Sequence, residues 1–134
     1  MSQRLPVAVI GAGRMGGFHA RVCAENPNVK LVAVVDSVAT QAETVAGKYG
    51  VEGLSSVEPL LGRIRAAVVA VPTVAHLAVA APLLEQGVSC LVEKPLAATS
   101  AEAALLVKAA AKGGATLQVG HSERFNPAFM ALGK

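Results

Sequence analysis

Three glycines near the N-terminus are spaced so that the backbone could bind a pyrophosphate. Gly11, Gly13 and Gly16 follow the apolar run Val7–Ile10, an order typical of a strand that turns directly into a helix. Gly11 suits a tight turn, Gly13 lets the backbone approach the phosphates without a Cβ, and Gly16 lets the helix pack closely. The helix would aim free N–H groups and its positive dipole end at the ligand. The candidate contacts in this turn are Gly11, Ala12, Gly13, Arg14, Met15 and Gly16.

An acidic residue after the next apolar run strengthens this interpretation. Leu31–Val35 predicts a second strand, and Asp36 follows it, twenty residues after Gly16. A carboxylate there can accept both ribose hydroxyls of NAD and would repel the 2′-phosphate of NADP. Glycine-rich turns also occur in strand–helix packing without a ligand, so Asp36, with its neighbour Ser37, favours NAD as the cofactor.

Lys94 is the residue best placed for proton chemistry. It lies just after the apolar run Val88–Val92, where the nicotinamide end of a bound cofactor is expected. A lysine there can donate to a substrate oxygen, and partial desolvation would lower its pKa enough to exchange protons. The ordinary alternative is a solvated loop lysine. Glu93 could orient Lys94, or it could be a solvated loop carboxylate.

The histidines and Arg124 leave several roles open. His76 could contact cofactor or substrate, or could serve in capping or packing, whereas a structural role is favoured for His19. His121, Glu123 and Arg124 come after the last predicted strand. Arg124 could hold a cofactor phosphate or carboxamide, or could pair with Glu123. No metal-ligand spacing and no Ser/His/Asp arrangement is recognisable.

The elements that must position these residues alternate between strand and helix. The predicted strands are Leu5–Ile10, Leu31–Val35, Val51–Leu54, Ala66–Val71, Val88–Val92 and Ala115–Val119. The predicted helices are Arg14–Glu25, Val38–Tyr49, a short one carrying Leu60, Leu61 and Ile64, Val74–Gln86, and one that ends at Gly113–Gly114. This pattern predicts an α/β fold of three layers, a doubly wound parallel sheet (Rossmann fold) with strand order 3-2-1-4-5-6.

Local patterns predict how the helices begin and which face they bury. Ser55 with Glu58, and Thr99 with Glu102, have capping-box spacing. Pro82 lies inside the fourth predicted helix, where it favours a kink or a late restart. The first helix is expected to bury Met15, Phe18 and Val22.

In such a sheet, ligands bind beyond the carboxyl ends of the strands. Most of the unusual polar residues of this aliphatic chain fall in the loops at that edge, so we expect the site there. Those loops are Gly11–Gly16, Asp36–Ser37, Pro72–His76 (with Pro72 and Thr73 as cofactor contacts), Glu93–Pro95 and Gly120–Arg124.

Composition bounds the class of protein. The chain has 134 residues, 53% of them hydrophobic and 3% aromatic, with a formal charge of +3. Such a core of Val, Ala and Leu suits a parallel sheet, and scattered basic residues argue against nucleic-acid binding. The uncharged stretch 66–84 is broken by prolines, so we expect no membrane span. Surplus apolar residues suggest a face covered by a second domain or another subunit, which allows a homo-oligomer.

The cysteines and the N-terminus indicate the compartment. Cys23 and Cys90 lie far apart without ligand spacing, which is typical of buried thiols in a reducing cytosol. The N-terminus shows no signal-peptide pattern. Both observations favour a cytoplasmic protein.

Four segments together resemble the Gfo/Idh/MocA oxidoreductases, which are NAD(P)-dependent sugar and cyclitol dehydrogenases. They are Gly11–Gly16, Asp36, Pro72–His76 and Glu93-Lys94-Pro95, which cover nearly the whole chain in the right order. The resemblance implies that Lys94, in Glu-Lys-Pro, is catalytic. The stretch Val119–Pro127 is similar to the lead into the family's second domain, in the form found in members that oxidise the 3-hydroxyl of UDP-N-acetylglucosamine-type sugars.

The resemblance also implies a substrate-binding domain that this sequence does not include. We therefore expect a cofactor domain at 1–122 and the start of a missing C-terminal domain at 123–134, in a fragment or a truncated product inactive by itself. The expected function is hydride transfer between NAD and a hydroxyl-bearing carbon of a sugar, cyclitol or nucleotide sugar. A non-catalytic NAD-binding module for redox sensing or interaction is the main alternative, and an amino-acid-pathway reductase is another.

Overall fold

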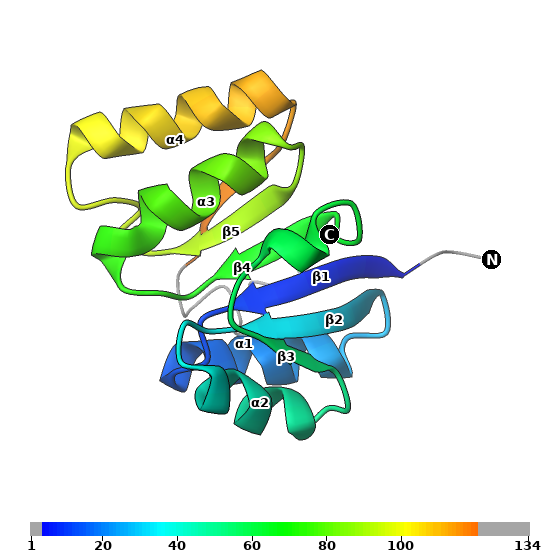
Figure 1. The fold of residues 1–134 in the computed structure, drawn as a ribbon. Helices are drawn as coiled ribbons and strands as arrows, with labels where there is room; N and C mark the ends of the chain where they lie inside the picture. Colours follow the sequence, from blue (N-terminus) through cyan, green and yellow to red (C-terminus); the bar gives the residue numbers. More distant parts are fainter. Residues whose placement is uncertain (1–3, 121–134) are drawn as a thin grey trace, which may run out of the picture.

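Six parallel strands form one sheet in the order β3-β2-β1-β4-β5-β6, as the sequence predicts. The computed structural model describes residues 4–120 and is drawn in Figure 1. The strands are β1 (Leu5–Ile10), β2 (Val29–Val35), β3 (Glu52–Leu54), β4 (Ala66–Val69), β5 (Ser89–Glu93) and β6 (Leu117–Gly120). The helices are α1 (Arg14–Glu25), α2 (Ala39–Gly47), α3 (His76–Glu85) and α4 (Ser100–Gly113), with the 3-10 turns η1 (Glu58–Leu60) and η2 (Thr73–Ala75).

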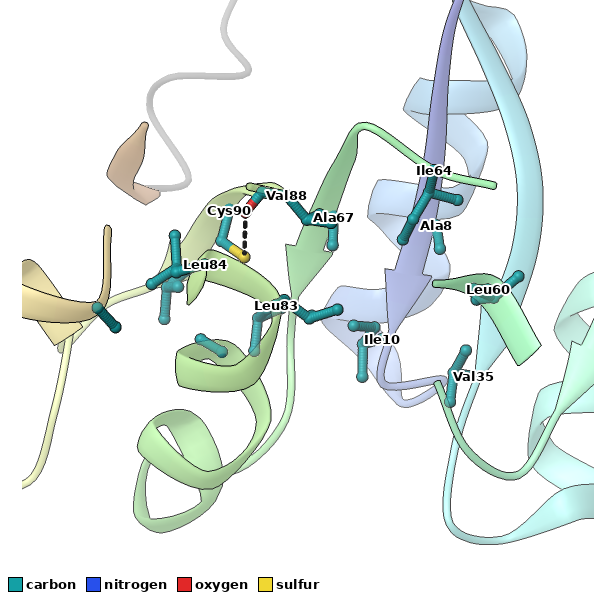
Figure 2. Packing of buried hydrophobic residues seen from close by; sticks show 14 of the residues in the cluster. Ala8, Ile10, Val35, Leu60, Ile64, Ala67, Leu83, Leu84, Val88 and Cys90 are labelled. Carbon is teal, nitrogen blue, oxygen red and sulfur yellow. Dashed lines mark hydrogen bonds between the residues drawn. The ribbon is translucent and has the colours of Figure 1, made fainter. Parts of the chain in front are cut away.

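Helices cover both faces of the sheet, which gives the expected three layers (Figure 1). On one face, α3 and α4 bury Leu83, Leu84 and Leu106 against alternate strand residues such as Val92. Figure 2 shows Leu83 and Leu84 of α3 directed toward the strands in this cluster. On the other face, α1 and α2 enclose a second core. These aliphatic strands are buried on both sides, as crossover helices require.

The buried face of α1 differs from the prediction. Met15 is 37% exposed, and Phe18 and Val22 are only half-buried, whereas the residues turned to the sheet are small or polar. They are Gly16, His19, Ala20 and Cys23. Small residues let the helix lie close to β1, so the bulkier apolar residues remain at its margins.

Some strand ends differ from the prediction because backbone N–H groups are lost or used elsewhere. The strand predicted to reach Val71 ends at Val69, and Pro72, which has no N–H, follows before η2. The strand predicted from Ala115 begins at Leu117, because the Ala115 N–H donates to Ala110 O and completes the end of α4. At that end Gly114 adopts the left-handed conformation, with φ of 67°.

One of the two predicted helix caps is confirmed. Thr99 Oγ1 accepts from the Glu102 N–H at 3.1 Å and begins α4. The box predicted at Ser55 is wrong, since η1 follows Val57 without a side-chain cap. The Glu58 carboxylate instead accepts hydrogen bonds from its own backbone N–H and from the Ser56 hydroxyl, in that order of effect, and these bonds lower the pKa of Glu58. The prediction of a restart at Pro82 is also wrong, because α3 runs through this exposed proline.

Within residues 4–120, no helix combines the length and the apolar character needed to cross a membrane. The two cysteines are free and buried, as predicted. Burial raises the pKa of Cys23 to about 11 and that of Cys90 to about 12. The side chain of Cys90, a residue of β5, lies in the core that β5 shares with α3, and its Sγ is 3.6 Å from Val88 O (Figure 2).

Candidate functional site

A cleft of about 610 Å³ opens at the carboxyl ends of β1, β2, β3 and β4. Its walls combine apolar side chains with a few polar ones, as is usual for small-molecule sites. The lining residues are Ile10, Gly11, Gly13, Val35, Asp36, Ser37, Gln41, Ser55, Ser56, Val57, Glu58, Ala70, Val71, Pro72, Ala75 and Val79. Predicted residues from three loops therefore meet in one cavity.

The glycine turn has the geometry that its spacing predicts. Gly11 has a φ of 107°, and a Cβ there would lie 2.3 Å from Ala70 O. A Cβ on Gly16 would lie 1.7 Å from Gly11 O, so no larger residue fits without displacing the turn. A Cβ on Gly13 would meet nothing within 4 Å, and Gly13 lines the cleft. The turn therefore leaves the backbone at Gly13 open to a ligand.

The N-terminus of α1 faces the same cleft edge. Arg14 and Met15 are exposed in its first turn, and the leading N–H groups of a helix have no partner within the helix. The Ala12 N–H has a different role, because it donates to Asp36 Oδ2 at 2.8 Å. Ala12 is thus a residue that joins the turn to β2.

Asp36 is fixed by the backbone on both sides of its carboxylate. Oδ2 accepts from Ala12 N, and Oδ1 accepts from Val38 N at 2.8 Å. Asp36 is half-buried on the cleft wall. Each carboxylate oxygen can accept a second hydrogen bond, so the group remains able to receive ribose hydroxyls.

Four residues that follow β3 were missed as site residues by the sequence analysis. Residues 55–58, which are Ser55, Ser56, Val57 and Glu58, line the cleft beside Asp36 and Ser37. The signal was available, since the carboxyl end of a third parallel strand must lie at the same edge as the others. The pairing of Val35 with Leu54 places it there.

Lys94 lies at this edge, directly after β5. Its N–H donates to Gly120 O at 3.0 Å, and the Lys94–Pro95 peptide bond is cis. The side chain is exposed and makes no hydrogen bond or ion pair with other residues in 4–120. The Lys94 backbone is thus hydrogen-bonded to β6, while its ammonium group is available.

Glu93 is held in place. Its carboxylate is only 14% exposed and lies 3.1 Å from His19 Nε2. A carboxylate only accepts, so the ring must donate its Nε2–H. Burial lowers the pKa of His19, while the Glu93 contact opposes that shift. The alternative of a solvated loop carboxylate is therefore wrong for Glu93.

His76 is buried between two loops of the site. It is 1% exposed, with Nδ1 3.0 Å from Leu96 O and Nε2 3.0 Å from Val71 O. Its ring contacts the backbone of the β4–α3 connection and of the segment after Lys94. Of the other predicted residues in that connection, Pro72 lines the cleft, whereas Thr73 lies half-buried in η2.

Some predicted residues lie outside the described part of the chain. His121, Glu123 and Arg124 fall beyond the described residues. Among residues 4–120, no group of three His, Cys, Asp or Glu side chains could hold a metal ion.

Comparison with known families gives a match over most of the chain. Residues 5–121 match the model of the Gfo/Idh/MocA oxidoreductase family, described as an NAD-binding Rossmann fold. This match includes the glycine turn, Asp36 and Lys94.

Individual relatives agree with that match. UDP-N-acetylglucosamine 3-dehydrogenase of Acidithiobacillus ferrooxidans is 36% identical over 92% of this chain and 39% of its own length. Inositol 2-dehydrogenase of Rhizobium meliloti is 34% identical over 94% of this chain and 38% of its own. The crystal structure of GenD2 from gentamicin A biosynthesis, in complex with NAD, superimposes with a TM-score of 0.88 and 35% identity over 98% of this chain and 38% of that one. The chain thus spans less than half the length of these relatives.

Proposed function

The chain belongs to the Gfo/Idh/MocA oxidoreductases, as their NAD-binding Rossmann domain, and from this premise we propose that it is the cofactor part of a dehydrogenase. The substrate class is a sugar, cyclitol or nucleotide sugar. Relatives that are named as dehydrogenases of UDP-N-acetylglucosamine and of inositol support this class.

The observation that carries the proposal is the position of Lys94 beside a cleft that fits NAD. The cleft offers open backbone at Gly13 and an oriented carboxylate at Asp36. Lys94 lies at the same sheet edge, since β1 pairs with β4 and β4 with β5. Cofactor and proton-transfer residue would thus meet at the carboxyl ends of these strands.

Each residue has a distinct part in the proposed reaction. When bound, NAD supplies a hydride acceptor at nicotinamide C4. The backbone near Gly13 and the N-terminus of α1 hold the pyrophosphate, and Asp36 accepts the ribose hydroxyls. Lys94 contacts the substrate hydroxyl and takes up its proton as the hydride leaves the same carbon, and it returns that proton to the carbonyl oxygen in the reverse direction. The remaining cofactor contacts we propose are Arg14, Met15, Ser37, Pro72, Thr73 and Arg124. The sequence also suggests Glu93 and His76 as contacts, but their polar side-chain atoms lie against His19 and against two backbone carbonyls, so we assign them to holding the loops.

The organisation of the whole protein is also a proposal. We assign 1–122 to the cofactor domain and 123–134 to the start of a substrate domain. The relatives support this division, because the chain covers only 39% of the length of the first of them. The two buried thiols fit the proposed cytoplasmic location.

The test is turnover of Lys94→Ala in the natural protein that contains this chain. We expect the rate to fall by about 100-fold or more, as for loss of a general acid–base. Lys108→Ala is the matched control, since Lys108 is an exposed lysine of α4, and it should keep full activity. A Lys94→Ala rate within a few-fold of wild type would contradict the proposal and favour a non-catalytic NAD-binding module.

A further inference from the structure

Two histidines are the only buried polar or charged residues among those described. His19 and His76 are each 1% exposed, in a domain whose cores are otherwise aliphatic. A buried polar side chain is retained at a cost in desolvation that its hydrogen bonds must offset. What each ring contacts therefore indicates what it does.

His19 connects α1 to the residue before Lys94. Its Nε2 lies 3.1 Å from Glu93 Oε1, and Glu93 is the last residue of β5. The helix that carries His19 is the one whose N-terminus faces the cofactor cleft. A displacement of Glu93 would move Lys94, its covalent neighbour.

His76 connects the cleft wall to the residue two positions after Lys94. Nε2 lies 3.0 Å from the carbonyl of Val71, which lines the cleft, and Nδ1 lies 3.0 Å from the carbonyl of Leu96. The imidazole thus bridges two backbone segments that are far apart in sequence.

The two contacts reach the Lys94 loop, residues 93–96, from opposite faces of the sheet. α1 contributes Ala20 and Cys23 to one core, and α3 contributes Leu83 and Leu84 to the other. Figure 1 shows these helices on opposite sides of the strands. Glu93 and Leu96 are each held, while the Lys94 side chain between them is exposed.

We propose that His19 and His76 are positioning residues that fix the Lys94 loop from the two faces of the sheet and so direct Lys94 toward the nicotinamide. Neither ring needs to touch substrate. The inference rests on the proposed function, because it takes Lys94 as the proton-transfer residue. It predicts that either histidine can be changed with little effect on cofactor affinity but a large effect on where Lys94 lies.

The test measures the position of Lys94 without turnover. Lysines of the full chain are reductively methylated with ¹³C-formaldehyde, and the Lys94 signal is assigned by its absence in Lys94→Arg. In the wild-type chain, NADH should shift this signal. In His19→Phe and His76→Phe, NADH should bind within about threefold of the wild-type Kd, with the Lys94 shift reduced to less than about half.

Conservative variants separate positioning from stability. His19→Gln retains an N–H donor for Glu93 and should restore much of the shift. The side-chain amide of His76→Gln can donate to one of the two carbonyls but lacks the ring that spans them, so this variant should restore part of the shift. Leu106→Val, which trims a fully buried residue of α4, is the control for lost stability and should leave the Lys94 shift unchanged.

The outcomes are distinct. A wild-type Lys94 shift in folded Phe variants would overturn the positioning role and leave the proposed function intact. If a Phe variant does not fold, the role of His19 is overturned by a wild-type shift in Glu93→Ala, which removes the acceptor of its hydrogen bond. The role of His76 is then overturned by a full wild-type shift in His76→Gln, for which only a partial shift is expected. Failure of the wild-type chain to bind NADH, or to shift Lys94 when it does, would overturn the proposed function and the inference together.

Discussion

The two ends of the site are built in different ways. One part of the cleft, which we call the adenosine end after its proposed occupant, is walled by Asp36, Ser37 and residues 55–58, and two backbone N–H groups fix the Asp36 carboxylate. The Lys94 loop is contacted by two buried histidines, yet the Lys94 side chain itself is exposed. The groups proposed to bind the cofactor therefore come from neighbouring loops at one edge of the sheet. The position of Lys94 instead depends on contacts that reach its loop from both faces of the sheet.

The largest expected effect tests whether NADH binding depends on the close packing of the glycine turn. In Gly16→Ala, the new Cβ would lie 1.7 Å from Gly11 O, so the turn must move. We expect a stability loss of about 3 kcal/mol and NADH binding weakened by about 100-fold or more. Thermal unfolding and NADH fluorescence titration measure these effects.

Gly17→Ala provides the matched control for that variant. Gly17 is the next residue of α1, and a Cβ there would meet nothing within 4 Å. A helical Gly→Ala change at an open position should stabilise by about 0.5–1 kcal/mol and leave NADH binding unchanged. If both variants have the same stability and the same NADH affinity, close packing at Gly16 is not required for the turn.

The next effect is confined to the adenosine end. Asp36→Asn removes the negative charge and keeps one oxygen for a backbone N–H. We expect the preference for NADH over NADPH to narrow by about 10- to 100-fold, or about 1.4–2.7 kcal/mol, because the 2′-phosphate is no longer repelled. Paired fluorescence titrations measure it, with Glu43→Gln on the exposed side of α2 as control. A wild-type chain that binds both cofactors equally would contradict the role of Asp36.

The adenosine end was predicted in part, since Asp36 and Ser37 were identified while residues 55–58 were missed. Glycine spacing, an acidic residue after the second strand and the aliphatic strands are local signals, and the strand order follows from right-handed crossovers. The contacts of Asp36 with Ala12 and Val38 were not predicted, although Ala12 lies in the predicted glycine turn and Val38 directly follows the predicted Asp36–Ser37 loop.

The sequence predicted where the Lys94 loop lies, but it did not predict the contacts of His19 and His76 with that loop. The apolar spacing of Met15, Phe18 and Val22 indicated the wrong face of α1. A hydrophobicity pattern counts large apolar side chains, whereas the buried face is set by how closely the helix packs against the sheet. The buried face follows Gly16, His19 and its small neighbours, where the short side chains decide how near the helix can lie. Contacts such as His76 with Leu96 O join residues twenty positions apart, and no local pattern encodes them.

A smaller effect tests whether stability alone can disturb either end. Thr99→Ala removes the oxygen that accepts from Glu102 N at the start of α4. We expect a loss of about 1 kcal/mol in the free energy of unfolding, with unchanged NADH affinity, since Thr99 does not line the cleft. Ser100→Ala, one residue further along, should change stability by less than about 0.5 kcal/mol. Chemical denaturation measures both, and weakened NADH binding in Thr99→Ala would show that the site depends on α4.

The smallest expected effect is a pH dependence of stability that arises from His19, which contacts the Lys94 loop and not the adenosine end. Burial lowers the pKa of His19 from its ordinary value of 6.5, so the folded protein binds this proton less readily than the unfolded chain does. The stabilising contribution is therefore complete above pH 6.5 and is lost as pH falls from there through the folded value, with a slope of at most about 1.4 kcal/mol per pH unit. In His19→Gln this component is absent, while the other histidines titrate in both proteins and cancel in the difference. Denaturation at pH 7.5 and pH 5.5 should show wild type losing more stability than the variant, by less than about 1 kcal/mol. If both proteins lose the same free energy of unfolding, the His19 contact with Glu93 compensates for the effect of burial on the His19 pKa. The stability contribution of His19 would then not depend on pH in this range.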